Sequence, residues 1–155
     1  MKILLTGFEP FGESPINPSH MLVDSLSHSS FRDAQIITAI LPVDHEKAPV
    51  VLMNVLDINQ PDAILCFGLA MGRAKISLER VAINLMDFRM PDNAGHQISD
   101  RPIIPDGPAA YFSTLPVRQF YDALRENDIP VELSLTAGSY LCNQVFCFLG
   151  RNTCL

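Results

Sequence analysis

The sequence has few positive charges and no run of them. Lysine and arginine together number 11 against 17 aspartates and glutamates, which gives a formal net charge of −6. Nucleic acids and anionic membrane surfaces both need clustered positive charge on the protein that binds them. We therefore expect neither kind of partner, and a small neutral or weakly charged ligand fits the composition better.

Long apolar runs are also missing. The N-terminal run that ends at Thr6 is too short for the core of a signal peptide, and no small-residue cleavage site follows it. No stretch approaches the roughly 18 consecutive apolar residues of a membrane helix. The expected location is the cytoplasm.

The cysteines lack any regular spacing. They stand at positions 66, 142, 147 and 154, and they form neither a CxxC pair nor a disulfide framework. Reduced thiols in a reducing cytoplasm are the expected state. Cys66 and Cys147 lie inside apolar runs and are expected to fill the core.

What is present is a globular composition in which strand and helix patterns alternate. The 155 residues, 48% of them apolar, are enough for one domain spanning 1–155. Apolar or alternating stretches predict strands at 2–6, 34–43, 62–70, 76–90 and 130–136. Helical periodicity predicts one helix that begins near Asn17 and three further helices at 45–59, 116–128 and 139–150. Alternation without repeats or linkers predicts an α/β fold, with a mainly parallel twisted sheet and helices on both faces.

One cysteine stands where a strand pattern becomes a helix pattern. The stretch "TAGSYLCNQVF" (136–146) places Cys142 just after a small-residue turn. If Ser139 caps the helix, Cys142 lies in its first turn, where the helix dipole lowers the pKa of a thiol. The alternative is a small apolar residue in the core.

A nucleophilic cysteine needs an acidic side chain and an imidazole, and the sequence marks neither of them clearly. Glu79 lies in "SLERVAIN" and is either a functional carboxylate or a solvated strand end. The four histidines, at 20, 28, 45 and 96, all precede Cys142. No spacing marks one of them as a general base.

Several segments together resemble one family. The segments "LLTGFEPFG", "INPS", "LERVAIN", "DFRMPDNAGHQ", "GPAAYFSTLPVR" and "SLTAGSYLCNQVF" occur in this order between Lys2 and Phe148. Their order and spacing resemble the pyroglutamyl peptidase I (pyrrolidone-carboxylate peptidase) family. The resemblance implies a cytosolic cysteine peptidase that removes N-terminal pyroglutamate from peptides. It also implies an α/β three-layer sandwich, a Glu–Cys–His triad and assembly into a homo-tetramer.

The resemblance also implies roles for individual residues. Cys142 matches the nucleophile and Glu79 matches the acidic residue that orients the catalytic histidine. Phe8 and Phe11 match the aromatic walls of the pyroglutamate pocket, and Asn17 belongs to the same N-terminal motif. Arg89 matches an arginine near the nucleophile, where its charge would stabilise developing negative charge.

These residue types can carry out the reaction with their own side chains. The thiolate of Cys142 would attack the carbonyl that follows the lactam ring and form an acyl-enzyme. A histidinium would then protonate the leaving amine. No metal and no organic cofactor is required.

The chain departs from the family pattern near its end. The family's histidine lies in a later segment, whereas here the sequence after Phe148 reads "LGRNTCL". We expect residues 149–155 to be an atypical tail and the family's C-terminal elements to be lacking.

Three hypotheses follow. The first is an active peptidase with another base, such as His45, His96 or a histidine of another subunit. The second is an inactive or severely impaired truncated homologue that still binds pyroglutamyl groups through Phe8 and Phe11. The third is an unrelated α/β small-molecule-binding protein.

Overall fold

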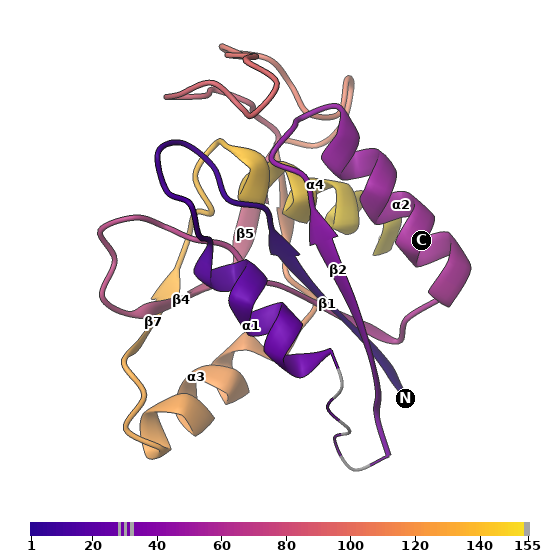
Figure 1. Ribbon diagram of the computed structural model, residues 1–155, viewed down its shortest axis with the longest axis vertical. Coiled ribbons are helices and arrows are strands. Elements are labelled where there is room, and N and C mark those ends of the chain that lie inside the picture. Colours follow the sequence, from indigo (N-terminus) through magenta and orange to yellow (C-terminus); the bar gives the residue numbers. More distant parts are fainter. Residues whose placement is uncertain (28, 30, 32, 154–155) are drawn as a thin grey trace. The chain divides into compact units, whose positions relative to one another are not determined.

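The computed structural model describes residues 1–153 except 28, 30 and 32. By their contacts these residues form two compact units. Figure 1 shows the helices and strands of the chain. The first unit consists of Met1–Leu69 and Met90–Gln97, and the second of Ala70–Arg89 and the described residues from Ile98 onward. Among the described residues, none of the helices combines the length and hydropathy needed to cross a bilayer.

The first unit is built on a parallel sheet. Its elements in chain order are β1 (Lys2–Phe8), α1 (Pro18–Leu26), β2 (Gln35–Leu41), α2 (Lys47–Asn59) and β3 (Ala63–Cys66). The strand order is β2-β1-β3, and both neighbours run parallel to β1. Apolar runs of this length, bounded by turns, are typical of strands that are covered on both faces. The carboxyl ends of all three strands therefore meet at one edge of the sheet.

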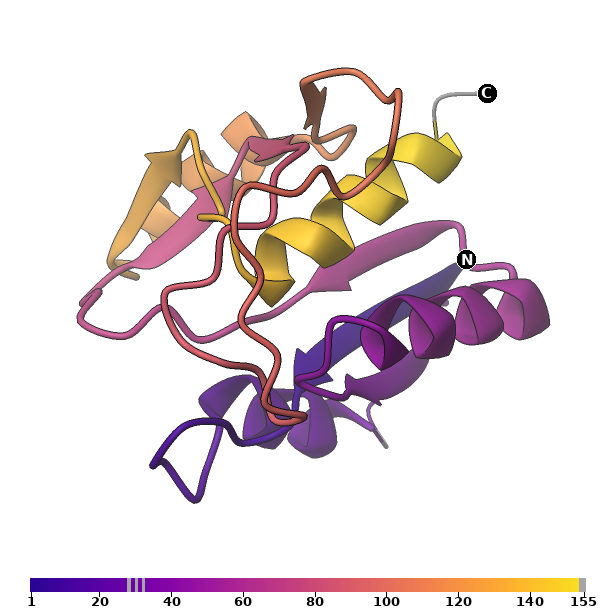
Figure 2. The same cartoon turned by 90° about the horizontal axis from the view of Figure 1, so that it is seen from above.

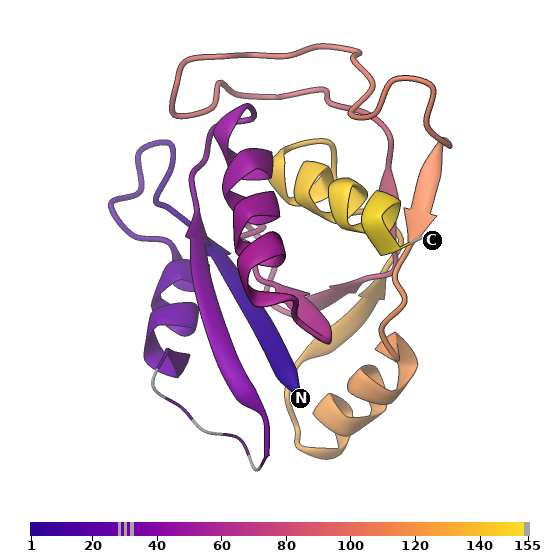
Figure 3. The same cartoon turned by 90° about the vertical axis from the view of Figure 1, so that its right-hand side faces the viewer.

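The two helices of this unit cover opposite faces of the sheet (Figure 3). The chain moves from β1 to β2 in one direction and from β2 to β3 in the other. Since crossovers between parallel strands are right-handed, a reversal of direction places successive helices on opposite faces. The side chains of Leu4, Leu41, Val23 and Leu52 are almost completely buried and form the core of this unit.

The second unit contains a short parallel pair of strands covered by a helix. β4 (Ile76–Glu79) runs parallel to β7 (Val131–Ser134), with Glu79 opposite Ser134. α3 (Val117–Glu126) packs against both strands (Figure 2). The carboxyl ends of these strands deliver Glu79 and the turn before the last helix to the same edge.

The last helix of the second unit packs on an antiparallel pair. β5 (Val81–Ile83) pairs with β6 (Ala110–Phe112), and α4 (Leu141–Thr153) contacts both strands. A side chain could not replace the hydrogen of Gly150, because a β-carbon there would lie 2.4 Å from Cβ of Tyr111. At this position α4 therefore lies directly against the side chain of Tyr111 in β6.

Most of the sequence-based predictions for secondary structure are confirmed, but several bounds differ and β6 was not predicted. The extended stretch 76–90 contains β4 and β5. The last helix begins at Leu141 and ends at Thr153, later at both ends than predicted, so residues 149–153 continue α4. The prediction that Cys66 fills the core is wrong, because it is the last residue of β3 and is exposed, whereas Cys147 is buried as expected.

Candidate functional site

The first turn of α4 carries Cys142. The first hydrogen bond of this turn runs from the backbone N of Gln144 to the carbonyl O of Tyr140 at 3.0 Å. Tyr140 therefore stands at the helix start, one residue later than a Ser139 cap would give. Cys142 is the second residue of the helix, and its side chain is half-buried. The first amides of a helix have no acceptor within the helix, and the dipole there favours a thiolate.

The turn before Cys142 is fixed to residue 87 by reciprocal hydrogen bonds. The hydroxyl of Ser139 donates to the carbonyl O of Asp87 at 2.6 Å, and the backbone N of Asp87 donates to the carbonyl O of Ser139 at 3.2 Å. The rings of Tyr140 and Phe88 meet edge to face, with centroids 4.7 Å apart. These contacts hold the helix start against the segment that follows β5.

The residue after Cys142 is anchored to the same segment. Asn143 is 0% exposed, and its Oδ1 accepts from the backbone N of Ile83 at 2.9 Å. Its Nδ2 donates to the carbonyl oxygens of Ile83 at 2.9 Å and Leu85 at 3.0 Å. Sequence reasoning missed this residue. The available signal was a polar side chain inside the apolar helical run "LCNQVF".

Glu79 ends β4 and makes one ion pair. Its Oε1 lies 2.9 Å from Nη1 of Arg73, while the side chain as a whole is 22% exposed. Its Oε2 is buried and has no hydrogen-bond partner among the residues that the structure describes. A buried carboxylate oxygen without a donor is costly, and such atoms in native folds call for an explanation. The solvated strand end considered from the sequence does not describe this side chain.

Arg89 ends the first segment of the second unit. Its side chain is exposed, and none of the ion pairs between described residues includes it. The preceding Phe88 is buried and donates its backbone N–H to Ile98. The backbone next to Arg89 is therefore fixed by Phe88, whereas the side chain of Arg89 is exposed to solvent.

The N-terminal motif lies in the first unit, where β1 ends and α1 begins. Phe8 is buried at the end of β1, and its backbone N donates to the hydroxyl of Ser19 at 3.1 Å. Asn17 caps α1, because its Oδ1 accepts from the backbone N and the hydroxyl of Ser19. Its Nδ2 donates to the carbonyl O of Glu9 at 2.9 Å. The buried amide of Asn17 thereby holds both ends of the loop that carries the half-buried Phe11.

The described histidines all belong to the first unit. His20 is partly exposed, 3.9 Å from Asp24. His45 and His96 both direct Nδ1 at the carboxylate of Asp92, at 2.9 and 3.5 Å. Burial opposes ionisation of Asp92, but hydrogen bonds from the backbone and ring of His45 and the backbone of His96 and Ala94 lower its pKa to about 2. His28 lies outside the described residues.

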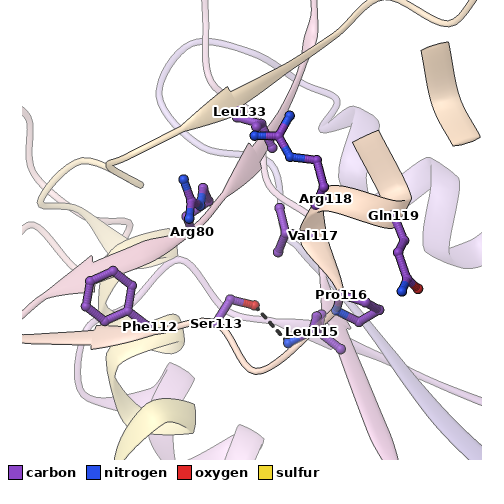
Figure 4. Close-up of a pocket in the computed structure, with 9 residues that line it drawn as sticks. All are labelled: Arg80, Phe112, Ser113, Leu115, Pro116, Val117, Arg118, Gln119 and Leu133. Atoms are coloured by element: carbon purple, nitrogen blue, oxygen red, sulfur yellow. Dashed lines mark hydrogen bonds between the residues drawn. The ribbon is translucent and has the colours of Figure 1, made fainter. Parts of the chain in front are cut away.

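A shallow cavity of about 320 Å³ lies in the second unit (Figure 4). It contains none of the residues that the sequence predicted for the site. Ser113 lines it, and the hydroxyl of Ser113 accepts from the backbone N of Leu115 at 3.2 Å (Figure 4). Its other lining residues are Arg80, Phe112, Pro116, Val117, Arg118, Gln119 and Leu133.

Comparison with known proteins decides the family. The model of the family described as "Pyroglutamyl peptidase" matches residues 1–153, beyond the point, Phe148, at which the sequence motifs end. The chain belongs to the pyroglutamyl peptidase family. These are cysteine peptidases that remove N-terminal pyroglutamate, so the resemblance inferred from the motifs is confirmed.

Curated pyroglutamyl peptidases are similar over most of this chain. The pyrrolidone-carboxylate peptidase of Pyrococcus furiosus is 48% identical over 145 residues, which is 94% of this chain and 70% of the relative. That of Vibrio vulnificus is 49% identical over 94% of this chain and 68% of the relative. The chain thus spans about seven-tenths of the length of these relatives.

Solved pyroglutamyl peptidase structures share the fold. A mutant pyrrolidone carboxyl peptidase from Pyrococcus furiosus is similar with a TM-score of 0.97 at 44% identity, covering 99% of this chain and 74% of the other. Pyroglutamyl peptidase I of Bacillus amyloliquefaciens gives a TM-score of 0.94 at 40% identity, covering 97% and 73%. The predicted α/β fold class with parallel strands is confirmed.

Proposed function

We propose that this chain cleaves the bond after an N-terminal pyroglutamate, with Cys142 as the nucleophile. The observation that carries this proposal is the anchoring of the first turn of α4 on both sides of the thiol. Ser139 is tied to Asp87, and Asn143 is tied to Ile83. A nucleophile must keep its position relative to the reacting carbonyl, because small displacements cost much of the rate.

The reaction proceeds through an acyl-enzyme. The thiolate of Cys142 attacks the carbonyl carbon that links the lactam ring to the next residue, and the oxyanion takes up the displaced electron pair. Amides at the start of α4 supply hydrogen-bond donors for such an oxyanion, and Arg89 contributes positive charge. The C–N bond then breaks, the amine leaves with a proton from a histidinium, and water hydrolyses the thioester to release pyroglutamate.

The carboxylate of Glu79 is assigned to the orientation of that histidine. Its buried Oε2 has no donor among the described residues, while Oε1 is engaged by Arg73. An imidazole N–H is the donor that such an atom would accept in a triad. The candidate sources of the imidazole are a histidine of another subunit, His45 and His96.

The aromatic residues of the first unit are assigned to recognition. The pyroglutamyl ring is a flat, uncharged lactam, so it favours apolar walls and a few amide-directed hydrogen bonds. We assign the walls to Phe8 and Phe11. Asn17 supports them indirectly, because its amide is engaged by Ser19 and Glu9 and fixes the intervening loop.

We also propose the substrates, the cellular location and the assembly of the enzyme. The substrates are peptides that begin with pyroglutamate, and the steps above use no metal or organic cofactor. The family resemblance supports action in the cytoplasm and assembly as a homo-tetramer.

A second candidate function is binding of pyroglutamyl groups without turnover. It is favoured by one observation, namely that no imidazole among the described residues donates to Glu79. Loss of one triad member typically lowers the rate by several orders of magnitude while binding persists.

Hydrolysis of a pyroglutamyl-anilide by the full chain separates the two candidates. Turnover that disappears in Cys142→Ala and persists in Cys66→Ala supports the peptidase, because Cys66 is an exposed thiol that the mechanism does not use. Saturable binding of a pyroglutamyl peptide without turnover supports the second candidate. Turnover that survives in Cys142→Ala contradicts the assignment of the nucleophile.

A further inference from the structure

Two imidazole side chains of the first unit converge on one buried carboxylate. Asp92 is 0% exposed at its side chain, and its Oδ2 accepts from the backbone N of His45 at 3.0 Å. The same oxygen lies 2.9 Å from Nδ1 of His45. Its Oδ1 accepts from the backbone N of His96 at 2.9 Å and lies 3.5 Å from Nδ1 of that residue.

The two imidazoles also lie against each other. Their ring centroids are 4.9 Å apart, and the ring planes are inclined by 77°. The side chain of His45 is 13% exposed and that of His96 is 46% exposed. The cluster therefore has a buried carboxylate at its base and opens toward solvent on the side of His96.

The spacing of the ligand atoms is compatible with a metal ion. One ligand atom of each residue lies within 4.8 Å of the other two. Around a tetrahedral ion with bonds of about 2.0–2.1 Å, neighbouring ligand atoms are about 3.3–3.5 Å apart. Nδ1 of His45 lies 2.9 Å from Oδ2 of Asp92 and Nδ1 of His96 lies 3.5 Å from Oδ1, so small shifts of these side chains would give that spacing around one ion. By contrast, 3.5 Å is too long for a good hydrogen bond between His96 and the carboxylate.

The donor set selects the kind of ion. Two imidazole nitrogens and one carboxylate oxygen suit borderline divalent transition metals such as Zn²⁺. Ca²⁺ and Mg²⁺ prefer shells of oxygen ligands, so they fit this cluster poorly. We propose that His45, Asp92 and His96 bind one divalent transition-metal ion, with the remaining coordination position open to water on the exposed side.

Such an ion would fasten the segment Met90–Gln97 to the start of α2. That segment already contacts two other parts of the first unit, because the backbone N of Asn93 donates to Val43 and its Nδ2 donates to Pro10. A metal that binds only the folded state stabilises it by mass action. The inference rests on this unit alone. Metal binding would remove His45 and His96 from the candidates for the triad imidazole and leave a histidine of another subunit as the source.

The test is metal binding by the full chain carrying Cys66→Ser and Cys142→Ser, so that these two thiols do not compete. We expect one equivalent of Zn²⁺ by calorimetry, an increase in Tm with Zn²⁺, and visible Co²⁺ bands without thiolate charge transfer. His45→Phe and His96→Gln should each weaken Zn²⁺ binding about tenfold or more, since even outer-shell changes cost that much. His96→Gln alters a half-exposed side chain, so it keeps the test valid if His45→Phe fails to fold.

His20→Gln is the matched control. This histidine also has a carboxylate four residues away, at 3.9 Å, but no third ligand among the residues that the structure describes. Its substitution should leave the Zn²⁺ affinity unchanged. The proposal is overturned if no equivalent binds at tens of micromolar Zn²⁺, or if His96→Gln and His20→Gln bind as the parent does.

Discussion

The side chain of Asn143 hydrogen-bonds the backbone of Ile83 through both its oxygen and its nitrogen. These residues are 60 positions apart in the sequence, and both bonds are 2.9 Å long. The amide of Asn143 thus satisfies the backbone N–H and carbonyl of Ile83 and fixes the helix turn that carries Cys142. The position of the proposed nucleophile depends on this pairing.

Replacing Asn143 by alanine should destabilise the fold. The substitution leaves the backbone N–H of Ile83 buried without its acceptor, which costs about 1–3 kcal/mol, and removes two further hydrogen bonds. We expect the free energy of unfolding, measured in urea, to fall by about 2–3 kcal/mol. Asn127→Ala is the matched control, because its amide makes one exposed bond to Ala123 and its loss should cost less than about 1 kcal/mol. Equal losses would argue against an anchoring role for Asn143.

Substitutions of Glu79 and Arg73 should show whether the carboxylate of Glu79 serves the reaction or only forms an ion pair that stabilises the fold. Because the pair is partly exposed, Arg73→Ala should lower the free energy of unfolding by less than about 1 kcal/mol. Glu79→Gln should leave stability within that range but lower kcat/KM for a pyroglutamyl-anilide by about 10³–10⁴-fold, as expected for loss of the orienting carboxylate of a triad. A chain that keeps full activity in Glu79→Gln contradicts the role proposed for Oε2.

The cysteines should differ in their reaction with iodoacetamide at pH 8. Cys147 is fully buried, and burial raises its pKa to about 11, so it should stay unmodified until the chain unfolds. Cys142 is half-buried at the start of α4 and should react in the native state. Desolvation raises the pKa of the Cys66 thiol to about 11, so Cys66 should react more slowly than Cys142 even though the residue is exposed. Peptide mass spectrometry reports each site separately. Modification of Cys147 at the rate of Cys142 in the native state would show that the packing around α4 is not as described.

The substitution Gly150→Ala tests the contact between α4 and β6, because the contact decides whether Tm falls or rises. Alanine has the higher helix propensity, which alone would stabilise the helix by about 1 kcal/mol. However, its β-carbon would lie 2.4 Å from Cβ of Tyr111, so repacking should cost about 1–3 kcal/mol. We expect a lower Tm for Gly150→Ala. An exposed change in the next position, Arg151→Ala, should leave Tm nearly unchanged, and a rise in Tm for Gly150→Ala would contradict the close approach.

The sequence was sufficient for the local elements because they depend on short-range patterns. Apolar runs and turn residues predicted β1, β2, β3 and β7, and Pro18 after Asn17 predicted the start of α1, where Asn17 is indeed the cap. Cys142 was likewise expected in the first turn of its helix, and it is the second residue of α4. These features follow from neighbours along the chain.

Long-range partners were not predictable from pattern. Asn143 and Ile83 are 60 residues apart, and His45 and Asp92 are 47 apart, so no periodicity links them. Cys66 was misjudged for a related reason. Its apolar run extends from 62 to 70, but only Ala63–Cys66 pairs with β1, and the side chain at the end of that strand is exposed.

The central claim is that Cys142 reacts with the carbonyl after a pyroglutamyl ring. The most direct measurement is mass spectrometry of the full chain after exposure to a pyroglutamyl chloromethyl ketone, compared with the prolyl analogue that lacks the ring carbonyl. The account predicts stoichiometric labelling of Cys142 by the pyroglutamyl reagent, much slower labelling by the prolyl reagent, and no such preference at Cys66. Labelling of Cys142 and Cys66 at similar rates by both reagents would contradict it.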